Sequence, residues 1–205
     1  MTEPRVNPFT PLMKDAINTS LRNLMVCLPG KVIAFDPGTQ MAQVECGIQK
    51  RINGVFRTIP IIDSVRVQFA GDNEWYFWHQ IKPGTEGLVH FSQRAVDTWN
   101  DQGGPVAPHE MRMFSAEDAY FVPGIRSTPR IIPGFVNEGV GMSSYDGATR
   151  LHLTSGQIKW EAGGQTLTLD SAGLKHNGTN VGDTHVHPQD PDSAGNSQQN
   201  TEPPQ

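Results

Sequence analysis

The sequence contains little of the material from which a compact single-chain core is built. Hydrophobic residues make up 36% and aromatic residues 8% of its 205 positions, and this apolar content is low for a compact monomer. Glycine and proline are instead abundant, with 21 and 16 copies, and turn formers favour short strands over long helices. We therefore expect a mainly β protein that buries part of its surface by assembling with copies of itself.

Positive charge, cysteine and long apolar runs are also scarce. The 16 Lys and Arg against 21 Asp and Glu leave a net charge of −5, which argues against nucleic acid and anionic membranes as partners. Cys27 and Cys46 lack metal-type spacing and are expected to be reduced and buried. No apolar run approaches the roughly 20 residues of a membrane-spanning helix. The N-terminus lacks a signal-peptide pattern, so we expect synthesis in a cytoplasm.

The first regular pattern predicts one amphipathic helix within an N-terminal segment, residues 1–30. Thr10-Pro11 is typical of a helix start, because a capping side chain precedes a proline in the first turn. Pro29-Gly30 is expected to end the helix, and its apolar stripe is expected to pack against something. The stripe consists of residues at helical spacing: Leu12, Met13, Ala16, Ile17, Leu21, Leu24 and Met25.

From Lys31 the apolar period changes to two, which is typical of strands. "MAQVECGI", residues 41–48, alternates cleanly, with Ala42, Val44, Cys46 and Ile48 on one side. Further strands are predicted within 54–70, 74–81 and 82–92, with a short ordered return in 112–125. No second helix is strong enough to cover a parallel sheet, so we predict a small antiparallel barrel over residues 31–128, because closure removes exposed edges.

A weak repeat of about eight residues follows a Pro/Gly-rich connector, residues 129–147. The units over residues 148–183 are "ATRLHLTS", "GQIKWEAG", "GQTLTLDS" and "AGLKHNGT". Each carries two large side chains two positions apart, which share one face of a strand. Such a unit cannot bury its stripe alone. Two arrangements remain open, strands intertwined between chains and a small meander packed on the barrel.

The last segment, residues 184–205, begins with two histidines and continues as a polar tail. His185 and His187 point to the same side of an extended chain, and imidazole is a common transition-metal ligand. The spacing alone also fits two solvent-exposed histidines before a disordered tail. The tail contains Pro188, Pro191, Pro203 and Pro204.

Several short motifs occur in an order and spacing that point to one family. They are Pro29-Gly30 with Val32, Asp36-Pro37, Lys82-Pro83-Gly84, Arg94 to Trp99, Phe114 to Gly124, and Thr184 to His187. From about Asn18 to its end, the chain resembles the central baseplate spike proteins of contractile-tailed phages, also called baseplate assembly protein V or cell-puncturing proteins. The lysozyme-like domain of larger relatives has no counterpart here.

The resemblance implies an N-terminal helix, an oligosaccharide/oligonucleotide-binding (OB) type barrel as a collar, an intertwined trimeric three-stranded β-helix as a shaft, and a metal-clamped tip. Three chains would bring six imidazoles of His185 and His187 together on the threefold axis. Six nitrogens suit iron or nickel, whereas zinc prefers four ligands and copper a tetragonal site. The family precedent favours one structural iron per trimer. Around this clamp, the polar tail is expected to fold back.

The resemblance also implies a homotrimer at the tail baseplate tip of a virion, bound to hub proteins, that pierces the host outer membrane when the sheath contracts. A phage and a phage-derived bacteriocin fit equally well.

No enzyme is expected, since the six-nitrogen site is closed and the neighbours Glu117 and Asp118 point apart in a strand. One alternative is an OB-type module that stacks single-stranded nucleic acid or glycan on the aromatic run Trp75–Trp78. We favour core and subunit interface for that run. A metallohydrolase would need a third ligand.

Overall fold

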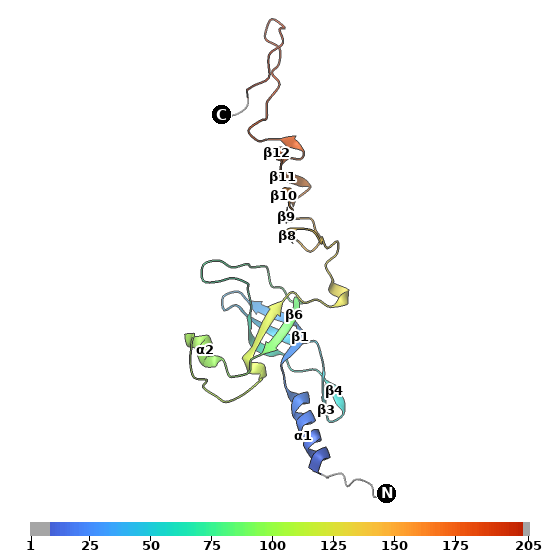
Figure 1. Ribbon diagram of the computed structural model, residues 1–205, viewed down its shortest axis with the longest axis vertical. Coiled ribbons are helices and arrows are strands. Elements are labelled where there is room, and N and C mark those ends of the chain that lie inside the picture. The colour runs from blue at the N-terminus through green and yellow to red at the C-terminus, as the bar shows by residue number, and fades with distance from the viewer. Residues whose placement is uncertain (1–8, 203–205) are drawn as a thin grey trace, which may run out of the picture. The chain divides into compact units, whose positions relative to one another are not determined.

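The computed structural model of the chain describes residues 9–202. It divides into two compact units, a barrel unit, Met1–Pro129, and a sheet unit, Arg130–Gln205. Figure 1 shows one helix of several turns and otherwise mainly strands, so the predicted mainly β fold is confirmed. Among residues 9–202, no helix has the length and apolar character needed to cross a membrane.

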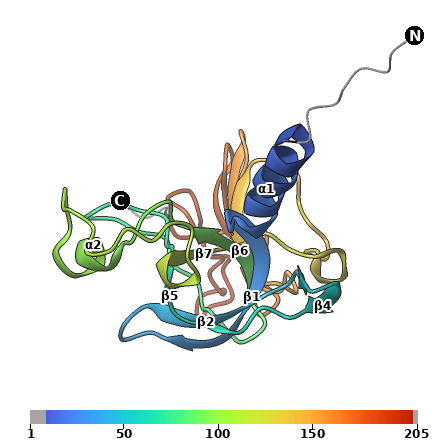
Figure 2. The ribbon, with the colours of Figure 1, turned by 90° about the horizontal axis from the view of Figure 1, so that it is seen from below.

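The barrel unit contains the predicted closed barrel of five strands (Figure 2). All neighbouring strands are antiparallel except β5 and β7, which run parallel and complete the closure. This is the five-stranded Greek-key architecture of OB folds. Around the barrel the order is β1 (Cys27–Asp36), β2 (Met41–Cys46), β5 (Ile62–Val67), β7 (Ala119–Pro123) and β6 (Glu86–Phe91), while β3 (Lys50–Ile52) and β4 (Val55–Arg57) form a separate hairpin.

Alternating side chains build the barrel core. In β2, the residues Ala42, Val44 and Cys46 are buried, as the period of two predicted. Gly30 of β1 lies directly opposite Gly87 of β6. A Cβ at Gly30 would lie 2.7 Å from Cγ2 of Val89 in β6, and one at Gly87 would lie 2.3 Å from the Val122 carbonyl oxygen of β7, so glycine permits these close approaches of strands. Burial raises the pKa of the Cys46 thiol, whereas Cys27 is only half-buried.

Two expectations for the barrel unit are wrong. Helix α1 spans Phe9–Asn23, and Pro29-Gly30 lies inside β1 instead of ending the helix. Residues 74–81 form no strand. They lie in a loop that is closed by an isolated bridge between Gly71 and Tyr76.

A long segment between β6 and β7 is held by one buried ion pair. It contains α2 (Asp97–Gln102) and a short 3-10 turn (Ala116–Asp118). Asp118 is fully buried, and its carboxylate accepts hydrogen bonds from Arg112 Nε at 2.8 Å and from the Val96 amide at 2.9 Å. The hydrogen bond to Asp118, foremost among the causes, raises the pKa of Arg112. The expectation that Glu117 and Asp118 point apart in a strand is wrong, because they lie in the 3-10 turn and both contact Arg112, the exposed Glu117 at 3.3 Å.

We expect Asp118→Ala to destabilise the barrel unit by about 1–3 kcal/mol, because it removes the fully buried acceptor of hydrogen bonds from Arg112 and from the Val96 amide. Urea unfolding followed by tryptophan fluorescence measures this loss. The matched control, Glu117→Ala, removes an exposed carboxylate and should stay within about 0.5 kcal/mol of the parent chain. Equal effects of the two substitutions would show that the buried pair does not anchor the segment.

The sheet unit is one antiparallel meander of six strands in sequence order. Its inner strands are hydrogen-bonded on both edges by neighbours of the same chain. The first strand, β8, lies inside the expected connector 129–147, which follows another short 3-10 turn (Thr128–Arg130). The strands are β8 (Val140–Ser143), β9 (Arg150–Leu153), β10 (Gln157–Ala162), β11 (Gln165–Asp170), β12 (Gly173–His176) and β13 (Thr179–Asn180).

Candidate functional site

The strand register of the sheet unit places its large side chains in two straight rows. Residues directly opposite each other in an antiparallel pair share one face, and so do residues two positions apart in a strand. Both rows therefore lie on the same side of the sheet, which we name the apolar face. The first row is Met142, Leu151, Trp160, Leu167 and His176, and the second is Val140, Leu153, Ile158, Leu169 and Leu174.

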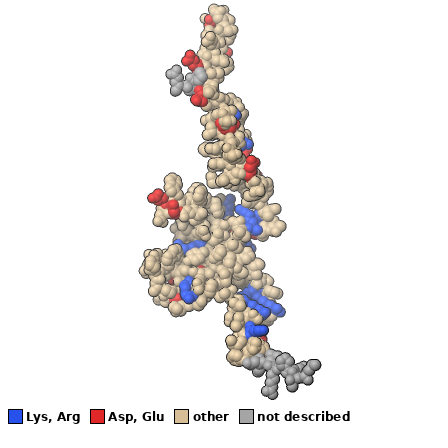
Figure 3. All heavy atoms as spheres, in the orientation of Figure 1, with Lys and Arg blue, Asp and Glu red and all other residues tan. Residues whose placement is uncertain are grey.

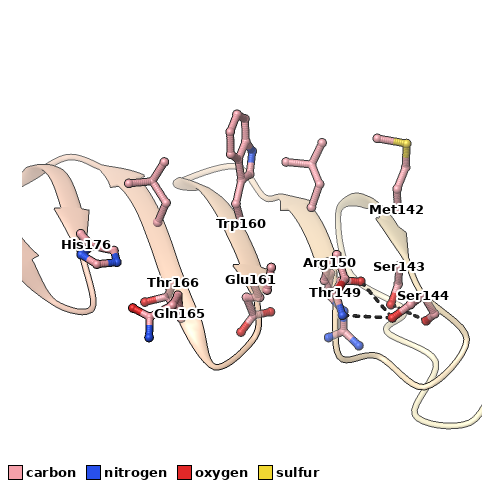
Figure 4. A pocket seen from close by; sticks show the side chains of 13 residues that line it. Met142, Ser143, Ser144, Thr149, Arg150, Trp160, Glu161, Gln165, Thr166 and His176 are labelled. Atoms are coloured by element: carbon pink, nitrogen blue, oxygen red, sulfur yellow. Dashed lines mark hydrogen bonds between the residues drawn. The ribbon is translucent and has the colours of Figure 1, made fainter.

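The opposite face of the sheet is polar. Lys159 forms a salt bridge with Glu161 at 2.7 Å, and Lys175 forms one with Asp170 at 3.0 Å. Hydrogen bonds from Lys175, and then from the Ala172 amide, lower the pKa of Asp170. Figure 4 shows the separation directly, since Met142 and Trp160 project to one side of the sheet and Glu161 projects to the other.

Nothing within the described part of the sheet unit covers the apolar face. None of residues 130–202 is buried, and Val140, Met142 and Trp160 are each more than half exposed. A groove of about 600 Å³ runs along the first row, lined by Met142, Leu151, Trp160 and Leu167 among others. Figure 3 shows few charged side chains on this unit, and the salt bridges of Lys159 with Glu161 and of Lys175 with Asp170 lie among them. A sheet with one apolar face needs a second layer to be stable.

The histidine pair follows the last strand of the meander. The rings of His185 and His187 lie on the same side, with centroids 5.1 Å apart and planes at 88°. Nδ1 of His185 lies 2.5 Å from the Gly182 carbonyl oxygen, so this nitrogen carries the proton and donates it. Nε2 of His185 is then the nitrogen with a free lone pair, the arrangement typical of metal-ligating histidines.

The polar tail folds back onto the histidine pair. The His187 amide donates to Thr201 Oγ1 at 2.8 Å, and the Thr201 amide donates to the His187 carbonyl at 2.9 Å. The turn of this hairpin is held by Asp192, which accepts hydrogen bonds from the side chain and amide of Asn196. These bonds lower the pKa of Asp192. Pro203 and Pro204 lie outside the described residues.

Among the described residues, the histidine pair is not joined by further metal-ligating side chains. Across residues 9–202, no group of three or more His, Cys, Asp or Glu side chains is placed to hold a metal ion. The structure brings His185 and His187 together, as the spacing predicted, but two imidazoles are too few for a structural site. Imidazole nitrogens suit a transition metal, so a structural site built on this pair would need ligands from elsewhere.

The aromatic run Trp75–Trp78 is exposed, and the expectation that it contributes to the core is wrong. Its four side chains are between 67% and 78% exposed. Asp72 shapes the loop, because its carboxylate accepts hydrogen bonds from the amides of Glu74 and Trp75 at 2.8 and 2.7 Å. These bonds, with the one from Trp75 foremost, lower the pKa of Asp72. The chain therefore presents four aromatic rings on a loop flanked by carboxylates.

Comparison with known families adds an independent observation on the barrel unit. Residues 28–124 match the family described as "Phage protein Gp138 N-terminal domain". The matched segment begins within β1, ends one residue after β7 and therefore spans the closed barrel. No curated protein matches the chain. The domain match supports a phage structural protein and its association with the virion.

Proposed function

We propose that this chain forms the trimeric central spike of a contractile tail baseplate, which pierces the host outer membrane when the sheath contracts. The observation that carries the proposal is the uncovered apolar face of the sheet unit, in which none of residues 130–202 is buried. The phage domain match over the barrel supports it independently. In this proposal the protein acts as a rigid piercing device, and no chemical step is assigned to it.

Three copies of the sheet unit can bury their apolar faces around a common axis. Two copies could also pack face to face, and the choice of three comes from the resemblance to the spike family. Complete burial of a large aliphatic or aromatic side chain contributes about 1.5–3 kcal/mol, so a row of such residues in each of three chains stabilises a shaft strongly. Because the meander is already hydrogen-bonded within each chain, assembly needs only side-chain burial.

The same axis would bring three copies of His185 and His187 together as six imidazole nitrogens. Such a site is coordinatively closed, so the metal would be structural, and family precedent favours iron. His185 fits this role through its Nδ1 hydrogen bond to Gly182, which leaves Nε2 for the metal. Structural metal ligation contributes on the order of 10 kcal/mol in the best cases. The clamp would hold three chains where few apolar side chains remain, and the returning tail would cover it.

In this proposal, the barrels form a collar on the tail hub, and the metal-clamped tip contacts the outer membrane first. Immunogold electron microscopy with antibodies against residues 184–202 provides the test. Gold at the baseplate end of tails is expected. Gold distributed along the sheath or on the head would contradict the placement at the tip, whatever the oligomeric state.

The exposed aromatic run favours a second candidate, an OB-type module that stacks single-stranded nucleic acid or glycan. Asp72 and Glu74 flank the rings, and no cation occurs between residues 67 and 81, although phosphate binding depends on Lys and Arg. The spike proposal therefore predicts no quenching of tryptophan fluorescence by a single-stranded oligonucleotide or a glycan. The alternative predicts quenching that Trp75→Ala with Trp78→Ala abolishes and, for the oligonucleotide, tighter binding as salt falls.

A further inference from the structure

Helix α1 presents a second uncovered apolar surface, at the other end of the sequence from the sheet unit. None of its residues is buried. The large apolar side chains of the helix and of the residue after it are between 43% and 64% exposed, and they are Phe9, Leu12, Met13, Ile17, Leu21 and Leu24. An isolated helix of about 15 residues is marginal in water, so this surface needs a partner.

The chain's own barrel does not cover this surface. Only Leu24–Val26 separate α1 from β1, and the Leu24 amide donates to the Leu21 carbonyl oxygen at 3.2 Å. The Val26 carbonyl oxygen accepts a hydrogen bond from the Phe91 amide of β6 at 3.0 Å. The end of the helix is therefore tied to the barrel strands, and no side chain of α1 enters the core that these strands enclose.

The spacing of the side chains matches a seam between parallel helices. Apolar or small residues recur at alternating intervals of three and four, which is the heptad pattern of a coiled coil. The positions that would form the seam are Thr10, Met13, Ile17, Ser20 and Leu24. Phe9, Ala16 and Leu21 flank the seam and widen the apolar surface to roughly half of the helix circumference. Such a wide surface suits two neighbouring helices better than one.

The charges of α1 are compatible with packing against copies of itself. Asp15 and Arg22 lie on the face opposite the seam, so they do not meet their counterparts in a parallel bundle. In parallel coiled coils, the residues on one side of the seam contact residues on the other side of the seam of the neighbouring helix, which lie five positions earlier in the sequence. Leu21 would then meet Ala16, and the aliphatic stem of Lys14 would meet Phe9 of the neighbouring copy. Neither contact brings like charges together.

We infer that α1 forms a parallel three-helix bundle with the α1 helices of two further copies of this chain. The inference rests on the trimer of the proposed function. It adds a contact between chains at α1, on the N-terminal side of the barrels, to the contact along the apolar face. A bundle this short would be weak between separate peptides. Tethering through the rest of a trimer raises the effective concentration of the helices to the millimolar range, which compensates for the small contact.

Thiol cross-linking on the full chain tests the bundle. In a Cys27→Ser background, Ile17→Cys places a thiol in the seam, and Asn18→Cys places one on the outer face as the matched control. Cys46 is buried and stays in place. A short bis-maleimide is expected to link Ile17→Cys chains into covalent dimers at least about tenfold faster than Asn18→Cys chains, because only the seam brings the thiols of different copies together.

Sedimentation equilibrium of the same samples separates this inference from the proposed function. Trimers with fast cross-linking only at position 17 support the bundle. Trimers that cross-link equally at both positions, or at neither, overturn the bundle and leave the spike proposal standing. Monomers overturn both.

Discussion

Replacing Leu151 and Leu167 together by aspartate is expected to convert the proposed trimer into monomers. Both residues lie in the first row of the apolar face, on either side of Trp160. Three copies would bring six carboxylates to the axis, and removing an ion from water without a partner costs several kcal/mol. The meander itself should persist, because its hydrogen bonds lie within one chain. Sedimentation equilibrium at micromolar concentration measures the change.

The matched control places the same two charges on the polar face. Ser143 is paired with Arg150, and Thr168 is paired with Lys159 and Lys175, so Ser143→Asp with Thr168→Asp adds carboxylates beside cations. This control should remain trimeric. If the Leu151 and Leu167 variant also remained trimeric, the apolar face would not be the interface between chains, and the shaft would have to assemble in another way.

Replacing His185 and His187 together by alanine is expected to abolish metal binding completely while the chain stays trimeric. The apolar face remains intact in this variant, so the shaft holds three chains without the clamp. The tip should fray, because the hydrogen bonds between His187 and Thr201 would lose the support of the clamp. Plasma mass spectrometry measures the metal, and hydrogen exchange over residues 184–202 measures the fraying.

The control for this variant is His152→Ala, which removes an imidazole from the polar face of the sheet. His152 contacts the Glu138 carbonyl oxygen through Nε2 at 2.7 Å, and its loss should leave the metal content unchanged. Unchanged metal content in the His185 and His187 double variant would show that the clamp lies elsewhere.

Local patterning made much of the fold predictable. The alternation in residues 41–48 identified the buried face of β2, and the paired large residues of the eight-residue repeats are those that the register aligns in two rows. Both signals arise because side chains two positions apart share a strand face. The polar tail gave no such signal, yet it forms a hairpin through the turn at Asp192 and the contacts of Thr201.

Other elements were mispredicted because tertiary context outweighed local preference. Residues 74–81 are rich in aromatic side chains, which favour strands, but the carboxylate of Asp72 binds two amides at the start of the run and turns the chain into a loop. Pro29-Gly30 is typical of a helix end, yet Gly30 is needed where β1 approaches β6. Gly141 and Ser143 alternate with Val140 and Met142 in β8 and concealed a strand that pairs with β9.

Only the part of the candidate site that lies within one chain, the histidine pair, could be predicted from the sequence. The spacing of His185 and His187 indicated that their rings share a side, and their 5.1 Å separation agrees. The hydrogen bond from His185 Nδ1 to Gly182 depends on the turn before the pair and has no sequence signature. The remaining ligands of the proposed clamp belong to other copies, so their arrangement lies beyond what one chain can specify.

Native mass spectrometry of untagged protein that has never contacted a metal column tests the central claim most directly. It measures the number of chains and the bound metal in the same particle. The spike proposal predicts three chains with one metal ion, and the ion's mass is expected to be that of iron. A single chain, or one metal ion in every chain, would contradict the proposed trimeric spike with a shared clamp.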